Sequence, residues 1–250
     1  MAQAEFKLKY AGSTLGYVWS VLKPLALFTM MYLVFGRIFK LGAVSQYYPL
    51  ALLIGIVLYT FFADATSIGM NSLVARESLL RKLTFPRVII PTAATLTAAM
   101  TFGVNAVVVT GFVAWNHLVP QLDWLLIIPL LLELYVFVLG VALILATLFV
   151  RFRDIGQIWE LTLQLFFYAS PIIYPIGYLP AWARNLAFLN PFTQVLQGIR
   201  ALIIYPEDVT TATTALGTYG RLIPIGIAFA TFAIGLWLFK RQEPFFAERV

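Results

Sequence analysis

Residues 88–122 read VIIPTAATLTAAMTFGVNAVVVTGFVAWNHLVPQL, without a charged side chain unless His117 is protonated. The next stretch, residues 124–150, contains a single charged residue, Glu133. A helix needs about 20 apolar residues to cross a hydrocarbon core about 30 Å thick. Both stretches exceed that length, so the chain is predicted to lie in a membrane.

The composition of the whole chain supports this prediction. Of 250 residues, 61% are hydrophobic and 11% are charged, whereas a soluble domain has about 25% charged residues. The chain contains no cysteine, no GxxxxGK[ST] loop and no HExxH helix. We therefore expect no catalytic residues, no metal site and no cofactor on this chain. Energy for any transport would come from another chain or an ion gradient.

Six apolar stretches are predicted to form transmembrane helices, at residues 24–41, 49–73, 88–115, 124–150, 155–176 and 220–239. Such long stretches suit helices better than the short alternating strands of a barrel. Six crossings put both termini on one side, and 12 of the 17 lysine and arginine residues fall on that side. Because cytoplasmic loops are rich in these residues, both termini are predicted to be cytoplasmic, with the protein in the inner membrane. The net charge of +6 then reflects topology, and no nucleic-acid partner is expected.

We predict an all-α polytopic membrane protein with a single transmembrane domain over residues 1–250. Basic and apolar side chains alternate from Phe6 to Tyr10, and Trp19 suits the headgroup level. The first segment is therefore expected to be an amphipathic interfacial helix, or alternatively a leader that only orients the first span. The expected parts are an interfacial segment at 1–23, spans one to five at 24–176, an extracytoplasmic segment at 177–219, the last span at 220–240 and a cytoplasmic tail at 241–250.

The loop between the second and third spans, ARESLLRKLTFPR at residues 75–87, has the pattern of a short amphipathic helix. Glu77 and Arg81 are four residues apart and can pair on one helical turn. Phe85 precedes Pro86, which should end the helix. An exposed amphipathic helix can dock into a groove on a partner. The alternative is a positively charged anchor without a partner.

Prolines interrupt the segment between the last two spans. Pro171, Pro175 and Pro180 prevent one continuous helix. Asn190 followed by Pro191 suits an N-cap and a first helical position. Two short re-entrant helices in the outer leaflet would fit this composition. An interfacial loop helix is the alternative.

Two sets of residues resemble one known family. The first set is Tyr10, Ser13, Leu15, Gly16, Trp19 and Pro24, and the second is Ser170-Pro-Ile-Ile-Tyr-Pro175, Leu179, Pro180, Arg184, Leu189, Asn190, Pro191 and Arg200. With the six-span layout, they resemble permease subunits of type-2 ABC polysaccharide exporters, which move O-antigen, capsule, teichoic acid or galactan. The resemblance covers essentially the whole chain.

The resemblance implies a homodimer with a conduit between its two copies, bound to two copies of a separate ABC ATPase that carries ATP and magnesium. The substrate would be a polyprenyl-diphosphate-linked polysaccharide. The homodimer would also contact membrane lipids. The loop at 75–87 would be the coupling helix. Its expected contact residues are Arg76, Glu77, Leu80, Arg81, Lys82, Phe85 and Arg87.

Further site residues follow from position and side-chain type. The aromatic residues Phe28, Tyr32, Phe35, Phe39, Phe166, Phe167 and Tyr168 are expected to line the glycan channel, since sugars bind aromatic faces; lipid contact or helix packing is the alternative. The lipid-diphosphate entrance is assigned to Lys23, Arg151 and Arg153. The extracytoplasmic gate is assigned to Pro171, Tyr174, Pro175, Asn190, Pro191 and Arg200.

Three carboxylates lie inside predicted spans: Asp64, Glu133 and Glu160. An ionised carboxylate at the bilayer centre costs about 2.5–3.5 kcal/mol, so each should face protein or water. Asp64 and Glu133 could form the proton relay of a secondary carrier, although no internal repeat is visible.

A type-2 ABC permease for lipids or drugs is another alternative. A polyprenyl-phosphate glycosyltransferase would need catalytic carboxylates, and Asp154 is too isolated for that role.

Overall fold

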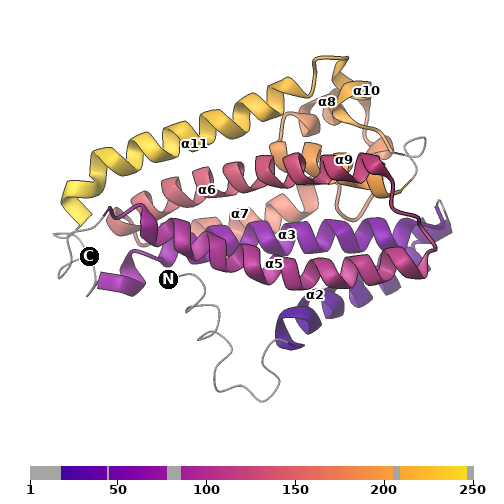
Figure 1. Cartoon of the computed structure of the whole chain (residues 1–250), viewed down its shortest axis with the longest axis horizontal. Coiled ribbons are helices and arrows are strands. Elements are labelled where there is room, and N and C mark those ends of the chain that lie inside the picture. The colour runs from indigo at the N-terminus through magenta and orange to yellow at the C-terminus, as the bar shows by residue number, and fades with distance from the viewer. Residues whose placement is uncertain (1–17, 44, 78–85, 205–208, 247–250) are drawn as a thin grey trace.

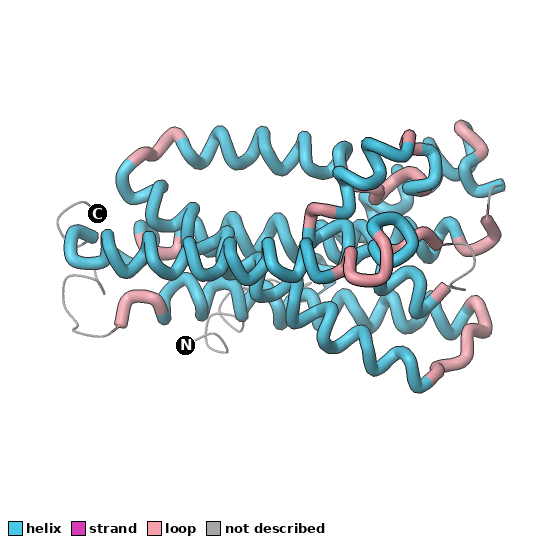
Figure 2. Tube along the Cα trace, turned by 90° about the horizontal axis from the view of Figure 1, so that it is seen from above, coloured by secondary structure: helices cyan, strands magenta, loops and turns pink. Residues whose placement is uncertain are grey.

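The structure is a computed structural model that describes residues 18–43, 45–77, 86–204 and 209–246. Throughout these ranges the ordered elements are helices, and none of the described residues forms a strand. The long helices run along one common axis, as Figures 1 and 2 show from two directions. The prediction of an all-α fold is confirmed.

Five helices in the described ranges are long and apolar enough to cross a membrane. They are α2 (Val18–Met31) with its π-helical continuation (Tyr32–Ile38), α3 (Tyr48–Asn71), α5 (Ile89–Trp115), α6 (Ile127–Arg151) with the preceding 3-10 turn (Leu122–Leu126), and α11 (Leu222–Gln242) with the following turn (Glu243–Phe245). Further short 3-10 turns occupy Leu41–Ala43, Val74–Arg76 and Ile176–Tyr178.

Two predicted span boundaries are wrong. The first described helix begins by Val18, so Pro24 lies inside α2 and does not start it. The fifth predicted span, 155–176, is a helix α7 (Ile155–Ala169) of only 15 residues. Ser170 is extended and Pro171 follows, because a proline disfavours the helical conformation of the residue before it. Helix α7 is therefore shorter than the five helices of spanning length, and the count of six spans is not confirmed.

Three short helices gather at one end of the bundle, the right end in Figure 1: α8 (Ala181–Phe188), α9 (Pro191–Ile203) and α10 (Ala212–Leu216). The predicted start of α9 is confirmed. Asn190 is the N-cap, with its Oδ1 accepting a hydrogen bond from the backbone N–H of Phe192 at 3.0 Å, and Pro191 is the first helical residue.

Helix α3 forms the centre of the bundle, packed mainly against α5 and α6. Phe62 of α3 is almost fully buried and contacts aromatic rings from three other helices. Its ring stacks on Phe166 of α7 with centroids 4.8 Å apart, and it lies 5.8 Å from the rings of Phe137 and Phe192. Because burial of large aromatic side chains stabilises a core strongly, these contacts fix α7 and α9 on α3.

Helices α6 and α11 approach each other backbone to backbone at two glycines. A Cβ atom at Gly140 would lie 2.6 Å from the backbone nitrogen of Phe232, and one at Gly235 would lie 2.5 Å from the carbonyl oxygen of Gly140. Helices in a membrane associate through close packing at small residues, because lipid provides no hydrophobic force between them. This contact therefore requires glycine at both positions.

The first prediction concerns this contact. Gly140→Ala should destabilise the protein by about 1–3 kcal/mol, because the added methyl group has no space. Gly226→Ala on the open side of α11 is the matched control, since nothing lies within 4 Å of a Cβ there. Thermal unfolding in detergent would measure both. Equal melting temperatures for the two variants would contradict the proposed packing.

Candidate functional site

The end of the bundle that carries α8, α9 and α10 is organised around one buried arginine. Arg200 of α9 is 5% exposed and donates four hydrogen bonds to backbone carbonyls. Its Nε and Nη2 donate to the oxygen of Ala51 at 3.1 and 2.7 Å. Its Nη1 donates to Pro171 at 2.7 Å, and its Nη2 also donates to Ile172 at 2.9 Å. One side chain thus ties α9 to α3 and to the chain that follows α7.

The interrupted backbone after α7 supplies two of the three acceptors, the carbonyls of Pro171 and Ile172. In a continuous helix the carbonyl of Pro171 would accept from residue 175, but Pro175 has no N–H. The carbonyl of Pro171 is therefore available to Arg200. Gly55 provides the space, since a Cβ there would lie 2.9 Å from Nη2 of Arg200. The break and the glycine together allow a guanidinium group to be buried with its donors paired.

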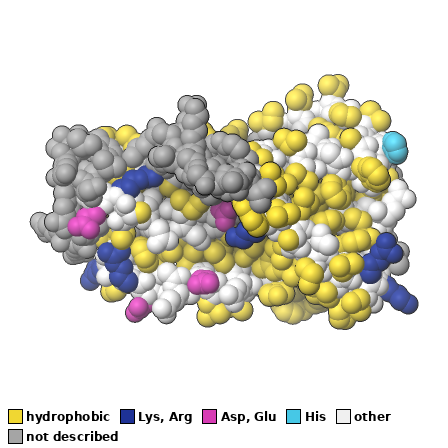
Figure 3. Space-filling view, turned by 90° about the horizontal axis from the view of Figure 1, so that it is seen from below, with side chains coloured by type: hydrophobic (Ala, Val, Ile, Leu, Met, Phe, Trp, Pro, Cys, Tyr) yellow, Lys and Arg dark blue, Asp and Glu magenta, His cyan; other side chains and the backbone are white. Residues whose placement is uncertain are grey.

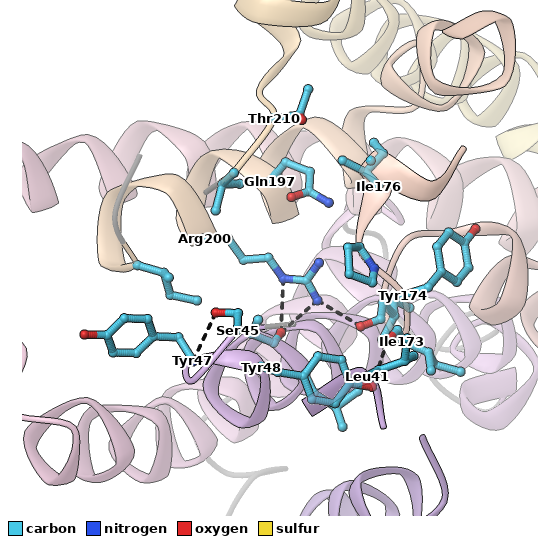
Figure 4. Close-up of a pocket in the computed structure, with 17 residues that line it drawn as sticks. Leu41, Ser45, Tyr47, Tyr48, Ile173, Tyr174, Ile176, Gln197, Arg200 and Thr210 are labelled. Carbon is cyan, nitrogen blue, oxygen red and sulfur yellow. Dashed lines mark hydrogen bonds between the residues drawn. The ribbon is translucent and has the colours of Figure 1, made fainter. Parts of the chain in front are cut away.

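A cavity of about 240 Å³ lies beside this arginine (Figure 4). Two tyrosines on its wall hold the loop after α7: the hydroxyl of Tyr48 donates to Ile173 at 2.9 Å, and that of Tyr174 donates to Ala169 at 3.1 Å. Three of the six expected gate residues, Tyr174, Pro175 and Arg200, therefore line this cavity, and a fourth, Pro171, accepts a hydrogen bond from Arg200. The other two, Asn190 and Pro191, lie at the start of α9 and do not line the cavity.

A second buried polar contact joins α6 to α9. Glu133 is 8% exposed, and both of its carboxylate oxygens accept from Nε2 of Gln194 at 3.1 Å. Asp64, on α3, lines a different region, a cleft that also contains residues of α2 and α5. The structure thus shows a helix-to-helix bridge at Glu133. It shows no polar path from Glu133 to Asp64 within the described residues, and a proton relay through the two carboxylates gains no support.

Helix α7 presents a polar stripe that the sequence reasoning missed. Its inner side is fixed to α3, where Tyr59 donates to the carbonyl of Leu163 at 2.9 Å and Trp159 donates to Thr66 at 3.2 Å. The opposite side exposes polar groups at spacings of three, four and four residues: Gln157, Glu160, Gln164 and Tyr168. An adjoining apolar stripe consists of Ile158, Leu161 and Leu165. The spacing of the polar residues was visible in the sequence and could have revealed the stripe.

The aromatic residues expected to line a channel divide into two groups. Phe28 and Phe167 are buried inside the subunit, where Phe28 packs edge-on against Phe112 and Phe167 against Tyr59. Phe166 is partly buried between Phe62 and Phe192. Tyr32 and Phe35 are likewise partly buried and pack against the core, whereas Phe39 and Tyr168 are exposed. Packing therefore accounts for much of the aromatic content.

The expected charged sites lie on separate elements. Arg151 and Arg153 are exposed at the end of α6, with their guanidinium groups 5.1 and 5.3 Å from the ring centroids of Phe152 and Phe149. Lys23 lies on α2 in the same cleft as Asp64, whose lining does not include either arginine.

The segment expected to form the coupling helix is described only in part. Leu80, Arg81, Lys82 and Phe85, like the interfacial segment 1–17, lie outside the described residues. Arg76 is half-buried and Glu77 is exposed at the end that follows α3. At the other end, the backbone N–H of Arg87 donates to the carboxylate of Glu243 at 2.9 Å, and its guanidinium donates to the Glu243 carbonyl. The loop is therefore anchored to the end of α11. In the described ranges, no group of three or more His, Asp or Glu side chains could hold a metal ion.

The second prediction tests the arginine contacts. Arg200→Met should destabilise the protein by at least about 2 kcal/mol, because the buried carbonyls lose their donors. Arg200→Lys should recover only part of this loss, since an ammonium group cannot reproduce the planar fork. Thermal unfolding would measure both variants, with the exposed Arg221→Met as the control. A melting temperature of Arg200→Met equal to that of the control would contradict the clamp.

Comparisons with known proteins agree with this architecture. The family model for ABC-2 type transporters matches residues 1–204. An O-antigen export system permease protein, RfbA of Klebsiella pneumoniae, is 27% identical over 245 residues, covering 98% of this chain and 91% of its own. RfbA of Myxococcus xanthus is 27% identical over 254 residues, covering 100% and 94%. The polysialic acid transport protein KpsM of Escherichia coli is 21% identical, covering 96% and 90%. The chain belongs to the ABC-2 type transporter family.

Proposed function

We propose that this chain is the membrane-spanning subunit of an ATP-driven exporter of a lipid-linked polysaccharide. Family membership and relatives named for O-antigen export and polysialic acid transport, aligned over nearly their whole length, support this proposal. The substrate would be a polyprenyl-diphosphate-linked polymer of the O-antigen, capsule, teichoic acid or galactan type. ATP and magnesium would bind two copies of a separate ATPase subunit. In this proposal the chain sits in the inner membrane with both termini cytoplasmic.

The polar stripe of α7 is the observation that carries the transport function. Ionisable and amide side chains are rare on surfaces that face lipid, and they generally face protein or a water-filled cavity. Gln157, Glu160 and Gln164 are exposed on one side of an otherwise apolar membrane helix. We therefore place this side of α7 on an aqueous conduit that a second copy of the chain completes. Helix α7 and the loop at 170–176 would together form the sixth crossing.

Other parts of the chain take roles around this conduit. Tyr32, Phe35, Phe39 and Tyr168 would offer aromatic surface to the passing sugars. Arg151 and Arg153 would receive the lipid diphosphate at the cytoplasmic entrance. The loop at 75–87 would dock on the ATPase, and its anchor at Glu243 would transmit the motion to α11. Helices α8 and α9 would re-enter the outer leaflet, with the Arg200 contacts holding the gate.

The third prediction tests the substrate. Depletion of the protein in its native host should cause long, finished, lipid-linked polymer to accumulate on the inner face of the membrane. Extraction and sizing of the lipid-linked glycans would measure this. Accumulation of short precursors alone, or of nothing, would contradict polymer export. The result would then favour a lipid or drug permease of the same family.

The fourth prediction tests the polar stripe in the same assay. Gln164→Leu combined with Glu160→Leu should restore the protein level after depletion but leave the polymer on the inner face, because the conduit loses its polar surface. Thr110→Leu is the matched control, since Thr110 is an exposed polar residue on α5 away from this stripe. Normal export by the double variant would exclude α7 as the conduit wall.

A further inference from the structure

A polar cleft opens on the side of the bundle between α2, α3 and α5. Its volume is about 350 Å³, and its wall includes Trp19 and Lys23 of α2, Asp64 of α3, and Thr101 and Asn105 of α5. Figure 3 views the molecule from the α2 side, where a basic and an acidic side chain are visible between the two charged ends of a largely hydrophobic face. The export function proposed above does not use this cleft.

The charges of the cleft are opposite but not paired with each other. Lys23 and Asp64 both line it, yet neither forms an ion pair or a hydrogen bond with a described residue. A lysine and a carboxylate that share a partly apolar site gain from contact with opposite charge. The cleft, with its volume of about 350 Å³, leaves space beside them for a ligand group that carries both signs.

Asn105 provides a second and independent indication that the cleft binds a polar ligand. Its side chain is 6% exposed, lines the cleft and has no hydrogen-bond partner among the described residues. The amide of Asn105 opens onto the cleft, where a polar ligand group can hydrogen-bond to it. Thr101, one turn earlier on α5, is also buried, but its hydroxyl already donates to Thr97. The amide of Asn105 is thus the available neutral group in this part of α5.

The location of the cleft indicates where its ligand originates. Asp64 lies seven residues before the end of α3 at Asn71, about 10 Å along the helix axis. Trp19 lies at the edge of the cleft, as is common for tryptophan at the headgroup level. Ile68, Phe61 and Phe102 provide apolar wall beside the polar groups. The cleft thus combines polar groups that suit a phospholipid headgroup with apolar groups that suit its first acyl carbons. It lies in the leaflet nearest to Asn71.

We infer that the cleft binds a zwitterionic phospholipid whose headgroup carries a primary ammonium, as in phosphatidylethanolamine. The Lys23 ammonium would donate to the phosphate, the Asp64 carboxylate would accept from the lipid ammonium, and the Asn105 amide would pair with the remaining polar groups. An anionic headgroup would leave Asp64 unpaired and repelled. For the same reason a diphosphate fits poorly, so Lys23 serves this lipid and not the diphosphate entrance.

The fifth prediction concerns lipid binding by the purified full-length chain. In nanodiscs with equal amounts of phosphatidylethanolamine, phosphatidylcholine and phosphatidylglycerol, native mass spectrometry should show phosphatidylethanolamine retained about tenfold over the other two, as one charge-assisted contact allows. Asp64→Asn should remove the preference over phosphatidylcholine, and Asp64→Glu should keep it. Lys23→Gln should lower retention of both zwitterionic lipids.

Two control variants test whether the lipid preference depends on the charges of the cleft. Lys240→Gln and Asp123→Asn change the same charges on exposed residues outside the cleft and should leave retention unchanged. Equal retention of phosphatidylglycerol, or an unchanged preference in Asp64→Asn, would overturn the inference. Displacement of phosphatidylethanolamine by an added polyprenyl diphosphate would overturn it in favour of a substrate site. Because retention is measured without transport, it is independent of the proposed export function.

Discussion

The four hydrogen bonds of Arg200 are the constraint on which the α8–α10 end of this protein depends. They join three segments far apart in the sequence: the start of α3, the loop after α7, and α9. A buried guanidinium is costly unless its donors are paired, and the carbonyls of Pro171 and Ile172 can accept from it because the helix is interrupted there. The helix break after α7 and the arginine in α9 therefore depend on each other.

This arrangement also determines the orientation of α7. Held at its end by the loop and along its inner side by Tyr59, Phe62 and Trp159, the helix cannot rotate its polar side into the subunit. Gln157, Glu160 and Gln164 remain exposed as a result. Elsewhere the helices pack closely, as α6 and α11 do at Gly140 and Gly235. Rigid packing on one side and an exposed polar stripe on the other are what a conduit wall requires.

Much of this fold could be predicted from the sequence, because the bilayer demands long apolar helices and α9 has an evident start in Asn190 and Pro191. The end of α7 could not be placed correctly, since apolar residues continue after Pro171 and hide the break. Arg200 was expected at the gate, but its partners are backbone carbonyls, which no side-chain pattern reveals. The polar stripe was not predicted because the aromatic residues of the same helix suggested a channel lining, although Phe167 is buried.

The most direct test of the central claim, that α7 faces water inside the membrane, uses the absence of cysteine from the natural chain. Single cysteines would be placed by Gln164→Cys on the polar stripe and by Ile234→Cys on the exposed apolar face of α11. A membrane-impermeant maleimide requires a hydrated thiolate. The account predicts labelling at position 164 and none at 234 in intact membranes. Equal protection of both positions would show that α7 faces lipid or packed protein, and it would contradict the conduit.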